Sequence, residues 1–169
     1  YGSSGPYGTL HVAMEMFAAS AGIKLLHVPF RGAAPALTAL LSGTVQALAS
    51  APGVLKPQVD DGKIRVLANW GAERVSAFPN LPTFKELGYK DVEFYIWAGL
   101  FAPAGLPEPV LSTLRNAMRD AMRSPEVIKT FETAGSPPAY LDSAEFTRFV
   151  DADSARLIVI EETAEIHLV

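Results

Sequence analysis

The feature that most constrains the fold is the alternation of short apolar runs with helical patterns in the first part of the chain. Apolar runs at 23–30, 45–50 and 64–68 predict buried strands. Between them lie segments whose apolar residues recur three and four positions apart, and the connections are short. Strands that alternate with helices in this way pair in parallel, because each helix returns the chain across the sheet. The sequence therefore predicts an α/β fold with a mostly parallel sheet flanked by helices.

Residues that are typical of helix starts and helix ends predict the boundaries of the helices. Thr9 stands where an N-cap belongs, and Gly22 follows the same helix as a stop signal. Pro35 fits the first position of the next helix, which Gly43 closes. The buried stripe of that helix is expected to be Leu37, Leu40 and Leu41, and Thr83 with Glu86 has the pattern of a capping box.

The C-terminal third differs in character from the rest. The aromatic run 92–101 predicts one more strand, and 102–109 holds three prolines and one glycine, which is typical of a connecting segment. Helical patterns then follow, the last of them preceded by Asp142 and Glu145 as a cap signal. We therefore divide the chain into residues 1–101 and residues 102–169, the second part being a crossover followed by C-terminal helices.

Composition excludes several classes of protein. The net charge is −4 and the only basic row, Arg115, Arg119 and Arg123, is sparse, so we expect no nucleic-acid partner and interpret the row as a solvated face. No apolar run is long enough to span a bilayer, which predicts no direct membrane insertion. Cysteine is absent and the three histidines lack metal-ligand spacing, so we expect no disulfide, no metal and no cofactor.

Motifs of catalysis are also missing. The sequence contains no Gly-x-Ser-x-Gly, no supported Ser/His/Asp set and no phosphate-binding P-loop. The acidic pairs Asp60–Asp61 and Glu161–Glu162 fall in a turn and at a helix end, where two carboxylates are not held apart for acid–base chemistry. The sequence therefore predicts a protein that is not an enzyme.

Three loops form the candidate binding site. In a parallel sheet, ligands bind beyond the carboxyl ends of the strands, where helix N-termini converge. The chain has small residues or a hydroxyl at each such place, together with unpaired first-turn N–H groups that suit an anion. The predicted ligand-binding residues are Gly8, Thr9, His11, Gly32, Ala33, Ala34 and Ser50.

Other polar and aromatic side chains allow two interpretations each. His11 lies in the first helical turn, where the helix dipole disfavours an imidazolium, so we expect a neutral, hydrogen-bonding histidine, with or without contact to the ligand, in preference to a catalytic acid. His27 is expected to be a satisfied core residue, and Arg31 either pairs with an anion or faces solvent. Tyr95 and Trp97 line a cleft or pack in a core.

Six stretches follow one another in a characteristic order along the chain. They are Ser4-Gly5-Pro6-Tyr7-Gly8-Thr9-Leu10-His11, His27-Val28-Pro29-Phe30-Arg31-Gly32-Ala33-Ala34-Pro35-Ala36-Leu37, Asp61-Gly62-Lys63-Ile64-Arg65-Val66-Leu67-Ala68, Phe78-Pro79-Asn80-Leu81-Pro82-Thr83, Leu100-Phe101-Ala102-Pro103-Ala104-Gly105 and Ser124-Pro125-Glu126-Val127. In this order they resemble the Bug-type solute receptors of tripartite tricarboxylate transporters. The resemblance covers nearly the whole chain up to about Leu157, and six motifs in order are far more specific than any single one.

The resemblance implies a periplasmic, two-lobed receptor with a Venus-flytrap fold of the type II periplasmic-binding-protein class. Such receptors bind small dicarboxylates or tricarboxylates and deliver them to the permease subunits in the membrane without any chemistry. Mature members are nearly twice as long, so residues 1–101 are expected to form the second, ligand-binding lobe and any signal peptide to lie upstream. Two alternatives stay open: the effector-sensing domain of a transcription regulator, and an enzyme built on a similar α/β lobe.

Two departures from the family pattern qualify this expectation. Ser50 stands where the family often has an aspartate, which disfavours an amino-acid ligand because no charge is left to hold its ammonium group. The tail 158–169 lacks the basic ending of the family.

A half-cleft buries only part of a ligand, so this chain alone is expected to bind weakly. Apolar residues of its C-terminal helices are expected to be exposed, and the chain to form dimers through them.

Overall fold

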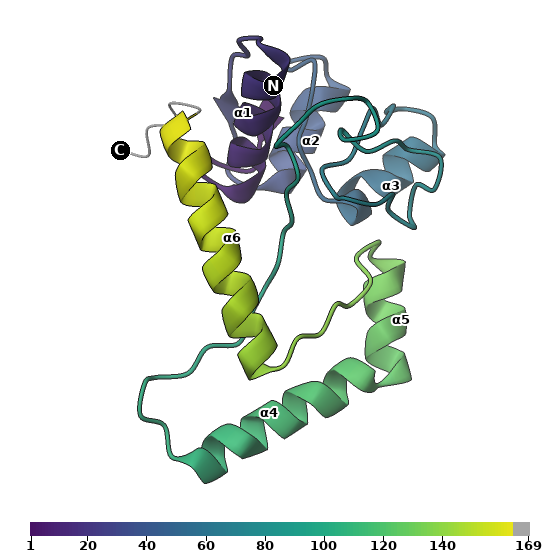
Figure 1. Ribbon diagram of the computed structural model, residues 1–169. Helices are drawn as coiled ribbons and strands as arrows, with labels where there is room; N and C mark the ends of the chain where they lie inside the picture. The colour runs from purple at the N-terminus through teal and green to yellow at the C-terminus, as the bar shows by residue number, and fades with distance from the viewer. Residues whose placement is uncertain (164–169) are drawn as a thin grey trace. The chain divides into compact units, whose positions relative to one another are not determined.

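The computed structural model describes residues 1–163 and shows two compact units. The first unit is built from Tyr1–Ile96 and the second from Trp97–Val159 (Figure 1). The tail 158–169 lies largely outside the residues whose side chains are described.

A small parallel sheet organises the first unit. Strand β1 (Gly2–Ser3) pairs with β2 (Val28–Pro29), with Gly2 opposite Val28. On its other side Gly2 forms a parallel bridge with Leu48. The strand β1 therefore lies between two later segments that run in the same direction, which confirms a parallel α/β arrangement but with very short strands.

Each of these three segments leads into a helix of the first unit. The helices are α1 (Thr9–Ala21), α2 (Ala33–Leu41) and α3 (Pro52–Asp60). Gly22 ends α1 in the left-handed conformation, with φ 64°, as its sequence predicted. Two predicted helix starts were wrong. Gly8 is the N-cap of α1, so Thr9 is its first residue, and α2 begins two residues before Pro35.

The core of the first unit forms between α1 and the sheet. The helix α1 buries Ala13, Met14, Met16 and Ala18, and Met14 packs with Tyr1 and Ala49. The indole of Trp70 donates a hydrogen bond of 2.9 Å to the carbonyl of Ala13. The leucine stripe expected for α2 was wrong, because Ala36 and Ala39 are the buried residues and Leu41 is exposed. Small residues let α2 lie close to β1, and larger side chains are left at the margin.

Much of the predicted strand content was also wrong. The residues 64–68 and 92–101 form no strand, and only part of 23–30 and 45–50 pairs with β1. A strand requires a neighbour for its N–H and C=O groups. The isolated bridge between Asn69 and Thr83 lies just after residues 64–68 and does not include them. The exposure of Leu67 agrees with this, since its side chain has no sheet face to cover.

The predicted capping box is confirmed. The Glu86 carboxylate accepts a hydrogen bond of 2.8 Å from the Thr83 N–H, and the Thr83 hydroxyl accepts one of 3.0 Å from the Glu86 N–H. Arg74 donates to the same carboxylate, and these hydrogen bonds hold the pKa of Glu86 below its ordinary value. The pair closes a series of turns rather than a regular helix.

Three helices make up most of the second unit: α4 (Glu108–Arg123), α5 (Pro125–Thr133) and α6 (Ser143–Thr163). The indole of Trp97 donates to the carboxylate of Asp153 on α6 at 2.9 Å and lies edge-on to Phe146 and Phe149. The helix α4 buries none of its residues, and Val110, Leu114 and Met118 are exposed on it, as expected.

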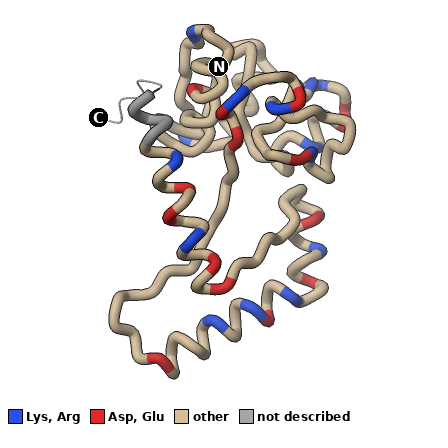
Figure 2. The backbone as a smooth tube through the Cα atoms, viewed as in Figure 1, with Lys and Arg blue, Asp and Glu red and all other residues tan. Residues whose placement is uncertain are grey.

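The basic row on α4 is more than a solvated face. Its first member, Arg115, donates a hydrogen bond of 3.0 Å to the carboxylate of Asp142, which precedes α6 and also accepts from the Ser143 N–H. Charged residues of both signs follow one another along α4 and α6 (Figure 2). Arg115 thereby fastens α4 to the start of α6, and it holds the pKa of Asp142 below its ordinary value.

Among residues 1–163, no helix has the length and apolar character needed to cross a bilayer. The same residues contain no group of three or more His, Cys, Asp or Glu side chains placed to hold a metal ion.

Candidate functional site

The starts of α1, α2 and α3 lie at one edge of the sheet. Each helix follows a segment that runs parallel to its neighbours, and the carboxyl ends of parallel strands meet at the same edge. The first two loops are joined directly, because the Gly32 N–H donates a hydrogen bond of 3.2 Å to the carbonyl of Ser4. This is the position at which open parallel sheets bind their ligands.

None of the three helix starts is capped by a side chain. The N-caps of α1, α2 and α3 are Gly8, Gly32 and Ala51, and each lacks a side-chain hydrogen bond. First-turn N–H groups have no partner inside a helix, so these starts present donors and the positive end of the helix dipole. Gly32 has φ 109°, a conformation that a residue with a Cβ adopts only under strain.

Two hydroxyl groups belong to the predicted set. Thr9 is exposed at the first position of α1. The Ser50 hydroxyl oxygen is buried and has no hydrogen-bond partner among the described residues. A buried hydroxyl without a partner is costly, and Ser50 precedes the start of α3 at the same edge of the sheet.

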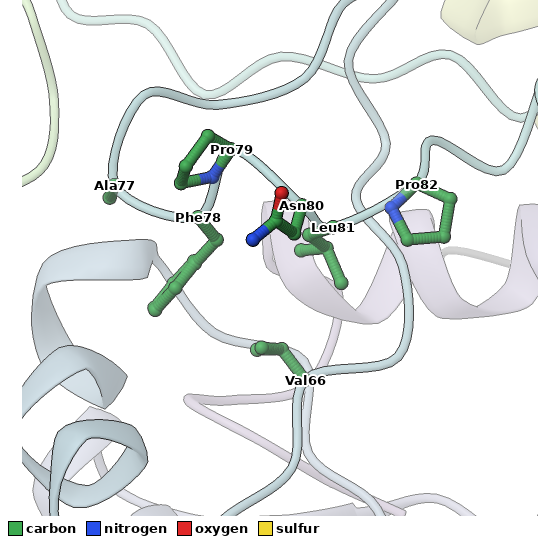
Figure 3. Close-up of a pocket in the computed structure, with 7 residues that line it drawn as sticks. All are labelled: Val66, Ala77, Phe78, Pro79, Asn80, Leu81 and Pro82. Atoms are coloured by element: carbon green, nitrogen blue, oxygen red, sulfur yellow. The ribbon is translucent and has the colours of Figure 1, made fainter.

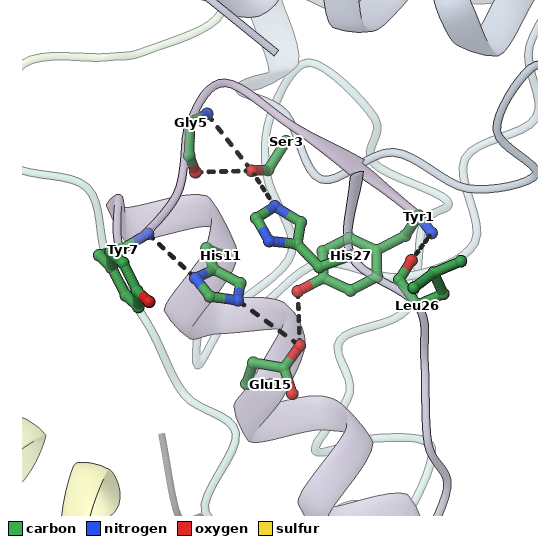
Figure 4. Close-up of polar contacts among 8 residues, drawn as sticks. All are labelled: Tyr1, Ser3, Gly5, Tyr7, His11, Glu15, Leu26 and His27. Carbon is green, nitrogen blue, oxygen red and sulfur yellow. Dashed lines mark hydrogen bonds and ion pairs between the residues drawn. The ribbon is translucent and has the colours of Figure 1, made fainter. Parts of the chain in front are cut away.

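His11 is engaged at both ring nitrogens (Figure 4). The Tyr7 N–H donates a hydrogen bond of 3.0 Å to Nδ1 of His11, and Nε2 faces the Glu15 carboxylate at 3.8 Å. That carboxylate accepts a hydrogen bond of 2.6 Å from the Tyr1 hydroxyl. Burial, with the nearby Glu15 carboxylate, raises the pKa of Tyr1 above its ordinary value and keeps its hydroxyl protonated. His11 therefore holds the loop that precedes α1 from within the first unit.

His27 stacks on His11 with ring centres 3.9 Å apart. It is half-buried and precedes β2 instead of lying inside a long strand, although its ring is hydrogen-bonded as expected: Nε2 lies 2.7 Å from the Ser3 hydroxyl. Burial lowers the pKa of His27, and the neighbouring His11 lowers it further. The side chains Tyr1, Ser3 and Glu15 were missed in the sequence because they precede or lie outside any recognisable motif.

The structure decides between the two interpretations given for Arg31 and Tyr95, and it places Trp97. Arg31 is exposed, in line with the solvent-facing interpretation. Tyr95 is 41% exposed, accepts a hydrogen bond from the Ala72 N–H and donates one to Glu93, so it does not pack in a core. Trp97 belongs to the second unit through its contact with Asp153.

A shallow hollow of about 360 Å³ lies elsewhere in the first unit (Figure 3). It is lined by Val66 and the loop 77–82, which includes Phe78 and two prolines. None of the predicted ligand-binding residues lines it, and it offers few polar groups to orient a ligand, so the helix starts remain the better candidate site.

Comparisons with known proteins show the family to which the chain belongs. The family model described as the tripartite tricarboxylate transporter family receptor matches residues 1–165. A Cupriavidus necator protein, named "UPF0065 protein in gbd 5'region", is 36% identical over 149 residues, covering 88% of this chain and 45% of its own length. Protein BugT of Bordetella pertussis is 29% identical over 155 residues, covering 90% of this chain and 47% of its own length.

A solved structure extends the likeness to the fold. The R. palustris protein Rpa4515, solved with adipate, is 28% identical with a TM-score of 0.85, covering 98% of this chain and 55% of that one. The chain belongs to the tripartite tricarboxylate transporter family of receptors, and it resembles the Bug proteins within it. It spans about half the length of the curated relatives that it matches.

Proposed function

We propose that this chain is the ligand-binding second lobe, with the C-terminal segment, of a periplasmic receptor for a small organic dicarboxylate or tricarboxylate. The receptor would deliver its ligand to the permease subunits of a tripartite tricarboxylate transporter and carry out no chemistry. Residues 1–101 would form the lobe and residues 102–169 the crossover and C-terminal helices. The observation that carries this proposal is the placement of three uncapped helix starts at one edge of a parallel sheet.

The chemistry of the site favours a carboxylate. Backbone N–H groups at helix starts bind anions, and the loops add the hydroxyl groups of Thr9 and Ser50. Some of these contacts are expected to run through water, which bridges polar groups nearly as well as direct contact. Ser50 offers no charge for an ammonium group, which supports a plain carboxylate over an amino acid. The adipate in the structure of Rpa4515 supports the same class of ligand.

Calorimetric titration of the complete receptor tests the proposal. The ligands would be linear dicarboxylates and tricarboxylates of increasing length, with matched amino acids and uncharged diamides as controls. We expect heat of binding from at least one carboxylate and none from the diamides. Turnover of a carboxylate, lost on substitution in this lobe, would support the enzyme alternative instead. A DNA-binding helix-turn-helix encoded upstream, in place of a signal peptide, would support the transcription regulator.

Substituting Thr9 and Arg31 separately tests how the anion is held. We expect Thr9→Ala to weaken carboxylate binding by about 1 kcal/mol or somewhat more, the net contribution of one hydrogen bond at an exposed position. Arg31→Ala should change the affinity little, because Arg31 faces solvent. Titration of both variants in the complete receptor measures the difference. Loss of binding in Arg31→Ala alone would show that a guanidinium group holds the ligand.

The buried Ser50 hydroxyl predicts opposite effects on binding and on stability. Ser50→Ala should weaken carboxylate binding by roughly 1 kcal/mol, if this hydroxyl donates to the ligand. The same substitution should leave the free energy of unfolding unchanged or raise it, because it removes a buried hydroxyl without a partner. Calorimetric titration and urea unfolding of the same variant measure the two effects. A variant that is destabilised and binds normally would assign Ser50 a structural role only.

A further inference from the structure

We infer that His11 is a positioning residue that fastens the loop 4–8 in its binding shape only while its imidazole is neutral, so that acidification releases the loop and weakens ligand binding. The inference rests on the proposed function, because it concerns the loop that supplies Gly8 and Thr9. It assigns His11 a role different from direct contact with the ligand.

The hydrogen bond between Tyr7 and His11 fixes the protonation state that the loop needs. The Tyr7 N–H donates to Nδ1 of His11 at 3.0 Å, so Nδ1 must carry no proton (Figure 4). The proton of the neutral ring then lies on Nε2, which faces the Glu15 carboxylate. An imidazolium carries a proton on both nitrogens. Charging His11 therefore removes the acceptor and leaves two N–H groups facing each other.

Near its start, the loop 4–8 is held by the Ser3 hydroxyl, and this hydrogen bond does not depend on the charge of a histidine. The Ser3 hydroxyl is fully buried and donates to the Gly5 carbonyl at 2.9 Å. Nε2 of His27 lies 2.7 Å from the same hydroxyl, and because a hydroxyl has one proton to donate, we assign Nε2 as the donor of this second bond. Protonation of His27 would add a proton at its other nitrogen and leave this contact intact. Ser3 thus holds the loop 4–8 at Gly5 whatever the charge of His27, whereas His11 holds it at Tyr7 only while the His11 ring is neutral.

The backbone conformation of Tyr7 depends on its contacts with His11. Tyr7 has φ 56°, in the left-handed region that a bulky residue with a Cβ rarely adopts. Such a conformation persists only where surrounding contacts enforce it. Its N–H bond to His11 is such a contact, and the edge-on packing of the two rings, 5.7 Å between centres, is a second. When the hydrogen bond is lost, Tyr7 is free to relax to an extended conformation.

The charged and titratable groups around His11 come from three segments. Glu15 of α1 faces Nε2, and the rings of Tyr1, Tyr7 and His27 lie against or near the imidazole. The Tyr1 amino group is bonded to the Leu26 carbonyl at 2.7 Å. The groups that face His11 are therefore one carboxylate, a second imidazole 3.9 Å away and two phenol rings. The loop is fastened while the His11 ring is neutral, because only then does Nδ1 accept from the Tyr7 N–H.

A competing effect has the opposite sign. A positive His11 near a helix start would also attract a carboxylate through space, which would strengthen binding in acid. We expect the loss of loop geometry to exceed this attraction, because the imidazolium would be partly neutralised by Glu15. The sign of the pH dependence therefore separates the two effects.

Two uncharged substitutions of His11 test the inference. The side-chain oxygen of Asn lies near the position of Nδ1 and can accept from the Tyr7 N–H, whereas the amide of Gln reaches toward the position of Nε2. In the complete receptor we expect His11→Asn to bind the carboxylate with the wild-type affinity at pH 7.5, and His11→Gln to bind about tenfold more weakly, the loss expected for one hydrogen bond. Between pH 7.5 and pH 5, the affinity of the wild type should fall about tenfold more than that of His11→Asn, which reports the effect of protonating the ligand itself.

A measurement without ligand keeps the inference separate from the proposed function. Long-range ¹H–¹⁵N spectra of the wild type should show Nδ1 of His11 unprotonated at pH 7.5, and hydrogen exchange of the Tyr7 amide should be slower in the wild type than in His11→Gln at the same pH. Failure of every carboxylate to bind, with these signals as expected, would refute the proposed function alone. Binding that strengthens in acid, or a protonated Nδ1 at pH 7.5, would overturn the inference.

Discussion

Replacing Met14 by Ala should destabilise the first unit by about 2–5 kcal/mol, the range for deleting a buried Met side chain. Met14 is 6% exposed and packs with Tyr1 and Ala49, against Leu25 and Trp70. The substitution leaves a cavity next to β1, and the surrounding side chains can fill it only in part. Since β1 pairs with both neighbouring segments, the loss should reach all three helix starts.

The two tryptophans of the chain allow this effect to be measured in one unit at a time. Trp70 lies in the first unit and Trp97 in the second. Urea unfolding of Met14→Ala would be followed by Trp70 fluorescence in a Trp97→Phe background. Leu26→Ala is the control, because Leu26 is 81% exposed and its truncation should change the free energy of unfolding by less than about 0.5 kcal/mol. Equal losses in the two variants would show that Met14 is not a core residue.

Replacing Asp153 by Ala should destabilise the second unit by about 1.5–3 kcal/mol, the range for hydrogen bonds to a charged group. The Asp153 carboxylate is 8% exposed and accepts hydrogen bonds of 2.9 Å from Trp97 and 2.7 Å from Arg156. Its loss leaves the Trp97 indole N–H without this acceptor and the start of the second unit without its link to α6. Unfolding followed by Trp97 fluorescence in a Trp70→Phe background measures the change.

The same carboxylate predicts a dependence on pH. Burial opposes its charge, but the hydrogen bonds from Arg156 and Trp97 prevail and hold the pKa of Asp153 below its ordinary value. A carboxyl group whose pKa is lower in the folded state stabilises the fold above its unfolded pKa, and this contribution is lost as the pH falls through the folded pKa. The second unit of Asp153→Ala should therefore lose less stability on acidification below about pH 4 than that of the wild type.

Asp151 provides the matched control for both measurements. It lies two residues earlier on α6 and is exposed, so Asp151→Ala should leave the free energy of unfolding nearly unchanged. An acid response of Asp153→Ala equal to that of the wild type would assign the acid sensitivity to other groups. Asp142 is the first to consider, because Arg115 also holds its pKa low.

The sequence by itself determined the order of the elements and several of their ends. The alternation of apolar runs and helical patterns predicted a parallel α/β arrangement, and Gly22 and the Thr83–Glu86 box end or begin local structure as expected. These features depend on residues that are close together in the chain. A glycine that adopts the left-handed conformation ends a helix, and a side chain that bonds to the backbone three residues away caps a turn. The loops that precede α1 and α2 were predicted from local signals of the same kind, namely the glycines in them.

Only the tertiary structure decided how much of the apolar sequence becomes sheet and what supports the site. Strand pairing depends on partners that lie far along the chain, so residues 64–68 remain unpaired although their composition suits a strand. The two-residue strand β1 has no periodicity to reveal it, yet it lies between the other two segments. The contact of His11 with His27, and of Tyr1 with Glu15, joins residues 14–16 positions apart. No local pattern encodes those contacts, because they form only when the strands are paired and α1 has packed against them.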